Sequence, residues 1–155
     1  MPLRQLSNYL DTHNIHYQTR NHIPAFTAQE VAQSCHLSGY HLAKTVIAKV
    51  DDEMVMVVTP ATEKVNFTEL LSESHAHTAE LASEDEFSER FPKCDLGAMP
   101  PFGNLFGMKV YVSEELTESE VIAFNSGFST EIVTMDFADY DRLVKPSIIR
   151  HGTQH

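Results

Sequence analysis

The chain has 155 residues, close to the size of one domain, and its hydrophobic fraction of 42% suits a single core and excludes a disordered chain. Its formal net charge of −11 argues against broad binding to duplex nucleic acid, because neutralising phosphates requires Lys and Arg. No apolar segment approaches the roughly 20 residues that span a bilayer, and no signal peptide is evident at the start of the sequence, so we expect a cytoplasmic protein.

Hydrophobic periodicity and turn residues predict helices interspersed with strands. Leucines at helical spacing begin the sequence, and Thr27 with Glu30 forms a capping box for a second helix. Runs rich in β-branched residues predict the strands, and a hairpin turn is expected at residues 51–53. The expected helices cover residues 3–10, 27–38, 66–71, 84–91 and 136–143. The expected strands cover residues 15–17, 42–50, 54–59, 79–82, 109–113, 121–124 and 130–134.

This order of elements predicts the fold class. Several strands are joined by hairpins, and neither a regular β–α–β series nor an internal repeat occurs. We therefore expect an α+β fold with a mixed, mostly antiparallel sheet flanked by helices. One domain is expected at residues 1–150, followed by a frayed tail at residues 151–155.

Lys44 is the first candidate for chemistry, because it lies in an apolar predicted strand and lysines are rarely buried unless they are paired or functional. The alternative is that Lys44 lies on the solvent face of its strand. Lys49 lies five residues further on, so it must point to the opposite face of a regular strand. At most one of the two lysines can therefore enter a given pocket.

The second candidate is a loop at residues 97–103, with the sequence GAMPPFG. Its two prolines fix φ and remove two backbone N–H groups, whereas its glycines allow positive φ and a close approach to a ligand. Such a rigid loop could present its remaining polar backbone groups to a substrate ester or a water. The alternative is a rigid surface crossover packed by Phe102 and Phe106.

The cysteines, the histidines and the known catalytic motifs give little support for another site. Neither Cys35 nor Cys94 belongs to a C-x-x-C pair, so we expect reduced, structural thiols. His75 and His77 could bind a metal, but no third ligand of suitable spacing is evident and no metal is expected. The sequence contains neither the G-x-S-x-G motif of serine hydrolases nor the glycine-rich nucleotide-binding motifs.

Four segments in this order resemble the YbaK/ProX family, whose domain also forms the editing insertion of bacterial prolyl-tRNA synthetases. They are TAQEVA at 27–32, LAKTV at 42–46, GAMPPFG at 97–103 and IAFNSG at 122–127. The resemblance extends from about residue 6 to residue 143 and implies a compact α+β domain that hydrolyses the ester between a wrong amino acid and its tRNA.

The resemblance also implies a site. The strand lysine of the family falls on Lys44, which would bind the terminal phosphate or the ester region, and the family loop falls on Gly97 and Pro101. Gly97 would offer backbone contact to the reacting water or the amino acid, in a largely substrate-assisted reaction that uses no metal or cofactor. The substrate-binding residues implied are His22, Thr27, Ala98, Pro101, Phe102, Asn125, Gly127 and Phe128.

The sequence departs from the family pattern in two ways that bear on its substrate and partners. Some family members have a pocket histidine after the late glycine, but here residues 127–130 read GFST, and Phe128 could instead size the pocket. The acidity suggests that a synthetase delivers the mischarged tRNA, which would be contacted at its 3′ end; neither DNA nor a membrane is expected. A binding module without turnover, recognising an aminoacyl end, an amino acid or a synthetase, is the alternative function. A small-ligand protein unrelated to tRNA is a third.

Overall fold

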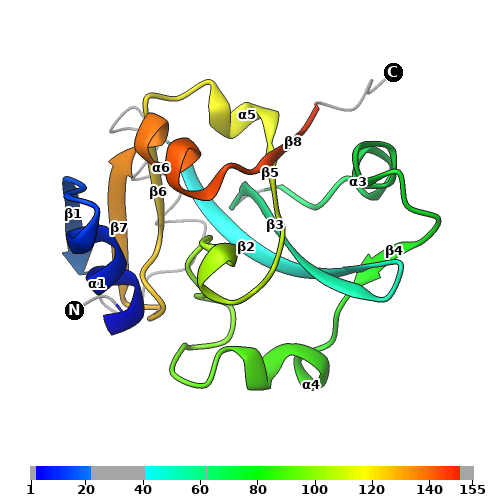
Figure 1. The fold of residues 1–155 in the computed structure, drawn as a ribbon, viewed down its shortest axis with the longest axis horizontal. Coiled ribbons are helices and arrows are strands. Elements are labelled where there is room, and N and C mark those ends of the chain that lie inside the picture. Colours follow the sequence, from blue (N-terminus) through cyan, green and yellow to red (C-terminus); the bar gives the residue numbers. More distant parts are fainter. Residues whose placement is uncertain (1–2, 22–40, 62, 151–155) are drawn as a thin grey trace.

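The computed structural model of the chain describes residues 3–21, 41–61 and 63–150. The strands are β1 (Tyr17–Asn21), β2 (His41–Val50), β3 (Glu53–Pro60), β4 (Ala79–Leu81), β5 (Val110–Ser113), β6 (Val121–Asn125), β7 (Glu131–Asp136) and β8 (Ser147–Ile149). They form one sheet in the order β1-β7-β6-β2-β3-β5-β8, and β4 pairs with β2 beside this path (Figure 1).

The sheet is mixed, as predicted. The antiparallel pairs are β1–β7, β6–β7, β2–β3 and β2–β4. The parallel pairs are β2–β6, β3–β5 and β5–β8. Seven of the expected strands are present with shifts of a few residues at their ends, whereas β8, a three-residue strand, was not predicted. The α+β class with helices around a mostly antiparallel sheet is confirmed.

Helices flank this sheet, and two of the five described α-helices, α3 and α4, begin at a side-chain N-cap. The helices are α1 (Arg4–Thr12), α3 (Phe67–Ser74), α4 (Glu84–Phe87), α5 (Glu114–Thr117) and α6 (Phe137–Val144), with 3₁₀ turns η1 (Ser88–Arg90) and η2 (Gly103–Leu105). The Asn66 side chain accepts from the Glu69 N–H at 3.1 Å and begins α3. Ser83 and Glu86 form a capping box for α4. The helix predicted at 84–91 ends earlier, because the chain tightens into η1 after Phe87.

The hairpin between β2 and β3 sets the register of the central strands. Asp51 and Asp52 both have positive φ, 49° and 68°, as in a two-residue type I′ turn. Glu53 therefore belongs to β3 and pairs with Val50, so the predicted three-residue turn at 51–53 was one residue too long. The Asp51 carboxylate accepts from the Thr78 N–H at 2.9 Å, which lowers its pKa and holds the segment before β4 against the turn.

The two faces of the sheet bury different clusters. Ile47, Met56 and Phe124 belong to the main core, together with the apolar faces of α1 and α6. The opposite face carries two smaller clusters. One contains Ala48 and Val57 with Leu70 of α3, and the other contains Leu42, Ala123 and Ile132. Because strand side chains alternate, Lys44 lies between these two smaller clusters, on the face away from the main core.

Candidate functional site

Lys44 is half-buried in the middle of β2, an interior strand with β6 on one side and β3 on the other. Its antiparallel partner is Thr59 of β3, so the two side chains share one face of the sheet. On the other side, the parallel pairing with β6 ends at Ala43 and Phe124. The next residues, Lys44 and Asn125, lie just beyond this last pair, where the two strands part.

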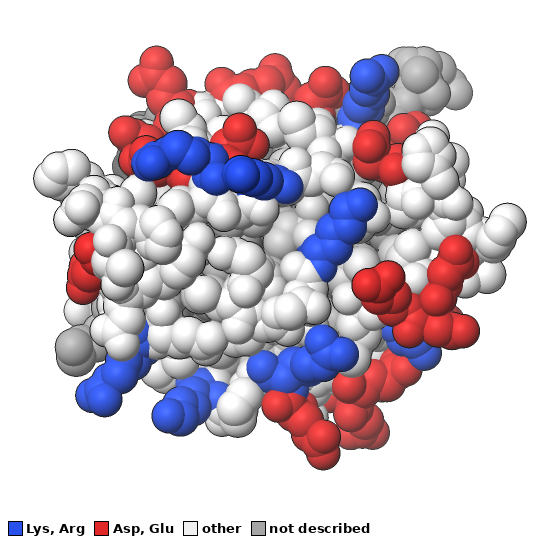
Figure 2. All heavy atoms as spheres, in the orientation of Figure 1, with Lys and Arg blue, Asp and Glu red and all other residues white. Residues whose placement is uncertain are grey.

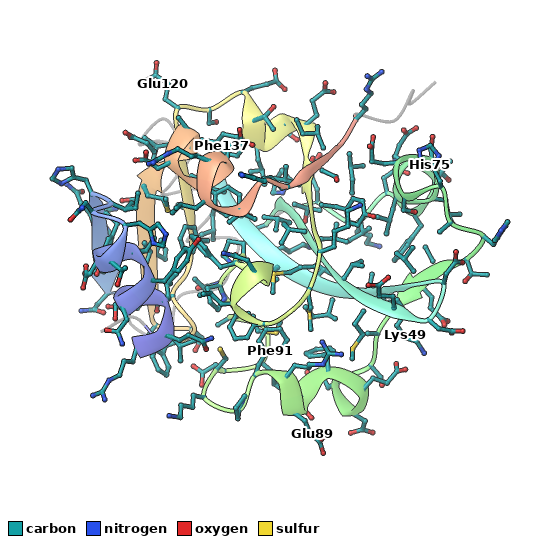
Figure 3. All side chains as sticks on the ribbon, viewed as in Figure 1. Lys49, His75, Glu89, Phe91, Glu120 and Phe137 are labelled. Carbon is teal, nitrogen blue, oxygen red and sulfur yellow. The ribbon has the colours of Figure 1, made fainter. Side chains whose placement is uncertain are left out.

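The electrostatic surroundings of the two strand lysines differ. The described residues provide no carboxylate within ion-pair distance of Lys44. Lys49 lies on the other face of β2, and Figure 3 shows it near the end of the β2–β3 hairpin. Its ammonium contacts Glu86 of α4 at 2.6 Å. This contact, with the Ser83 N–H, lowers the pKa of Glu86 to about 2. Lys49 is therefore part of a structural ion pair, whereas Lys44 has no such partner among the described residues.

The 97–103 loop is exposed at its start and buried at its end. Gly97 is exposed with φ +95°, a conformation that side chains rarely adopt, although no atom lies within 4 Å of the position of a Cβ. Phe102 is 0% exposed and packs edge-on against Phe124 and Tyr140, with ring centroids 5.5 and 5.3 Å apart. The Tyr140 hydroxyl donates to the Pro101 carbonyl at 2.7 Å. The core therefore fixes the base of the loop while Gly97 remains accessible.

A second set of contacts fastens this loop to the turn between β6 and β7. The Asp95 N–H donates to the Gly127 carbonyl at 2.8 Å, and the Asp95 carboxylate accepts from the Ser129 N–H at 2.9 Å. Gly127 has φ +111°, and a Cβ there would lie 2.9 Å from Leu3 Cβ, so a side chain would be both strained and crowded. These contacts place the Gly97 segment beside the end of β6.

The predicted site residues therefore separate into three groups. The first consists of residues around the end of β6 that are at least partly exposed or lie in its turn: Lys44, Gly97, Asn125, Gly127 and Phe128. The second consists of loop residues buried in the protein: Ala98, Pro101 and Phe102. The third, His22 and Thr27, lies outside the described residues. Lys44 and Asn125 follow the last pair of β2 and β6, and Asp95, two residues before Gly97, is hydrogen-bonded to the turn after β6.

The aminoacyl-tRNA editing domain family matches residues 22–143, which includes all of these segments. The chain belongs to this family. The sequence has no significant match among the curated proteins. Among solved structures, this editing domain is similar to the hypothetical protein APE2540, at 15% identity and a TM-score of 0.80 over 94% of this chain and 97% of the other.

Two further structures are similar. A candidate trans-editing enzyme for prolyl-tRNA synthetase is 15% identical with a TM-score of 0.79, over 94% of this chain and 92% of that one. A candidate signal transduction protein from Marinobacter aquaeolei VT8 is 15% identical with a TM-score of 0.69, over 96% of this chain but only 30% of that one. At 15% identity these structures show only that the fold is shared. Membership of the editing domain family rests on the match over residues 22–143.

Sequence reasoning missed several polar residues of the editing domain. Thr59 carries a buried hydroxyl directly opposite Lys44. Ser126 and Glu131 are both buried, and the Ser126 hydroxyl donates to the Glu131 carboxylate at 2.9 Å. Asp95 fastens the loop. Only Thr59 left a signal in the sequence, as a hydroxyl at the end of an otherwise apolar strand; the others depend on contacts between distant segments.

The charge distribution of the editing domain is uneven. In the view of Figure 2, acidic side chains gather at the top, over α5, and at the lower right, over the β2–β3 hairpin and β4. Lys and Arg side chains are scattered over the rest of this face, at the upper left, near the centre and along the lower edge. This face therefore offers no broad cationic surface for the body of a tRNA. No helix in residues 3–21, 41–61 and 63–150 has the length and apolar character needed to cross a membrane.

A metal has no evident site in the described part of the chain, where no three His, Cys, Asp or Glu residues cluster to hold one. His75 ends α3 in a left-handed conformation with φ 59°, and the His77 N–H donates to Asp51. The two histidines therefore belong to the segment between α3 and β4 rather than to one strand face.

Cys94 is expected to react slowly with thiol reagents. It is a free, half-buried cysteine; burial, and then the charge of Asp95, raise the pKa of its thiol to about 11. Only about one molecule in a thousand would carry the reactive thiolate at pH 8. Iodoacetamide labelling of the Cys94 peptide, followed by mass spectrometry, should rise about tenfold per pH unit between pH 8 and 10. Rapid labelling at pH 7.5 would contradict a protected thiol.

Proposed function

We propose that this editing domain is a free-standing deacylase that hydrolyses mischarged aminoacyl-tRNA at the site around Lys44 and Gly97. The observation that carries the proposal is a half-buried lysine without an acidic partner among the described residues, in a chain of the aminoacyl-tRNA editing domain family. Removing a lysine ammonium from water without a partner costs free energy, and a bound ligand that supplies the opposite charge would offset this cost. The 3′ end of a tRNA offers phosphate and ester oxygens for this role.

The reaction would add a water oxygen to the ester carbonyl carbon and break the bond from that carbon to the ribose oxygen. The ribose oxygen receives a proton, and the amino acid leaves as a carboxylate. Lys44 would act as a point charge that holds the terminal phosphate or the ester region. A fixed charge of this kind lowers the barrier by positioning the substrate and by stabilising the developing negative charge.

Gly97 would contribute through its backbone. The Gly97 N–H makes no backbone hydrogen bond with the described residues. The next N–H, that of Ala98, donates to the Asp95 carbonyl at 2.9 Å. Because the core holds Pro101 and Phe102, the accessible end of the loop has a fixed position. Gly97 can therefore hold the attacking water or the substrate without reorganisation at the moment of reaction.

The acidic surface agrees with contact limited to the acceptor end. A formal charge of −11 opposes the approach of a polyanion, so affinity for whole tRNA should be weak. A synthetase partner that carries the tRNA would relieve this restriction. The same charge motivates the alternative, a binding module that retains the pocket without turnover.

Multiple-turnover hydrolysis decides between these functions. The purified protein would be incubated with excess tRNAs mischarged with alanine, serine or cysteine, and the released amino acid would be measured, with and without the cognate synthetase. Release of several equivalents per protein is expected for at least one species. Binding of a non-hydrolysable aminoacyl-adenosine analogue with no release from any species would instead identify a binding module.

A further inference from the structure

Thr59 carries a buried hydroxyl without a partner among the described residues, on the face of the sheet that Lys44 shares. Its residue is only 5% exposed, and the described residues provide no hydrogen-bond partner for its Oγ1 atom. Buried hydroxyls are nearly always hydrogen-bonded, since a buried polar group without a partner loses its hydration and gains nothing in return. Valine has nearly the same shape and would avoid this cost. The hydroxyl of Thr59 therefore requires an explanation outside the contacts of the described residues.

The position of Thr59 indicates where its partner comes from. Thr59 pairs directly with Lys44 across β2 and β3, so both side chains project from the same face. Its neighbours on that face are apolar, with Val57 two residues earlier in the same strand and Leu42 two residues before Lys44. Thr59 is thus a single neutral polar group among apolar side chains, next to a half-buried ammonium group.

Depth separates the two groups. Lys44 is only half-buried, so a charged phosphate or ester region bound to it can remain partly hydrated. Thr59 is almost completely buried, and a phosphate would not be desolvated beside a neutral hydroxyl. The part of an aminoacyl end that can reach Thr59 is therefore the small uncharged amino-acid side chain.

We propose that Thr59 Oγ1 hydrogen-bonds the side chain of the aminoacyl group, so that this site selects an amino acid bearing a hydroxyl, of the serine class, over alanine. This inference rests on the proposed function of the Lys44 site. A hydroxyl can donate to Thr59 or accept from it, and serine is little larger than alanine. With an alanyl group in the site, the Thr59 hydroxyl would stay unpaired, and sites with unpaired polar groups discriminate against such ligands.

The test compares the binding of seryl and alanyl adenosine analogues in which an amide replaces the ester. Wild type should bind the seryl analogue about 3- to 10-fold more tightly, the effect of one hydrogen bond. Thr59→Val should bring this ratio close to one, chiefly by weakening seryl binding, and should melt at the same or a higher temperature. Thr45→Val is the matched control. Thr45 is similarly buried but pairs with Val58 of the main core, so its replacement should leave the ratio unchanged.

The outcomes separate this inference from the proposed function when hydrolysis of seryl-tRNA is measured in parallel. An unchanged ratio in Thr59→Val, or no seryl preference in wild type, would overturn the assignment of Thr59 even if hydrolysis is robust. Loss of the seryl preference in Thr59→Val without any turnover by wild type would support Thr59 and reject the deacylase. Failure of wild type to bind either analogue, together with no hydrolysis of seryl-tRNA, would overturn both.

Discussion

Replacing Lys44 with alanine is expected to lower kcat/KM for deacylation by about 100-fold or more, the scale of losing one preorganised electrostatic contact to the reacting group. The melting temperature should stay close to that of wild type. Lys44 has no ion pair with the described residues, so its removal breaks no salt bridge among them. Single-turnover hydrolysis of a mischarged tRNA, together with thermal unfolding by circular dichroism, measures both effects.

Lys49→Ala provides the matched control. Lys49 belongs to the same strand and carries the same charge, but it points to the opposite face and pairs with Glu86 at 2.6 Å. Its loss removes an exposed ion pair, which usually contributes little, and it changes the net charge as Lys44→Ala does. Activity within about twofold of wild type is expected. Equal losses in the two variants would point to a general effect of charge on tRNA binding, and full activity of Lys44→Ala would remove Lys44 from the mechanism.

A third variant, Lys44→Arg, separates charge from geometry. Arginine keeps the positive charge but replaces a compact ammonium with a planar, branched group. If Lys44 only attracts the tRNA, the arginine variant should retain most of the activity. If Lys44 must fit beside Thr59 on the face of the sheet that they share, kcat should fall with little change in KM, since the missing interaction is then made mainly in the transition state.

The central strands were predictable because their signals are local. Residues 42–50 and 54–59 are apolar and rich in β-branched residues, and acidic residues separate them. Their register was not predictable to the residue. A turn at 51–53 would place Lys44 opposite Pro60, whereas the two-residue turn at Asp51 and Asp52 places it opposite Thr59. A shift of one residue in a turn thus decides which side chain shares the face of Lys44.

The arrangement of the 97–103 loop could not be predicted from the sequence, because it depends on contacts with distant residues. Its glycines and prolines predicted a rigid segment, and both interpretations, a ligand-binding loop and a packed crossover, were open. The structure combines features of both, because Phe102 is buried while Gly97 is exposed. The difference arises from Phe124 and Tyr140, which lie 22 and 38 residues further along the chain. No local pattern encodes such contacts. The short α5 and β8 were missed because elements of three or four residues carry little periodicity.

Phe102→Ala is expected to destabilise the protein by about 3 to 5 kcal/mol, the usual cost of removing a fully buried aromatic ring. The ring is 0% exposed and contacts Phe124 and Tyr140, so its removal leaves a cavity under the loop. Denaturation by urea, followed by fluorescence or circular dichroism, measures this loss. Activity should fall as well, because the Pro101 carbonyl and the Gly97 end of the loop would no longer be held.

Phe106→Ala tests whether this effect is specific to the base of the loop. Phe106 lies close in sequence and packs on Phe91 with centroids 4.5 Å apart, but it is only half-buried, so a smaller loss of stability is expected (Figure 3 shows Phe91). The resemblance implied instead that Phe102 contacts the substrate directly. That role predicts a raised KM for Phe102→Ala with nearly unchanged stability. A stability loss below about 1 kcal/mol would therefore restore Phe102 to the binding surface. A large loss, partly recovered in Phe102→Leu, would assign Phe102 to positioning the loop that presents Gly97.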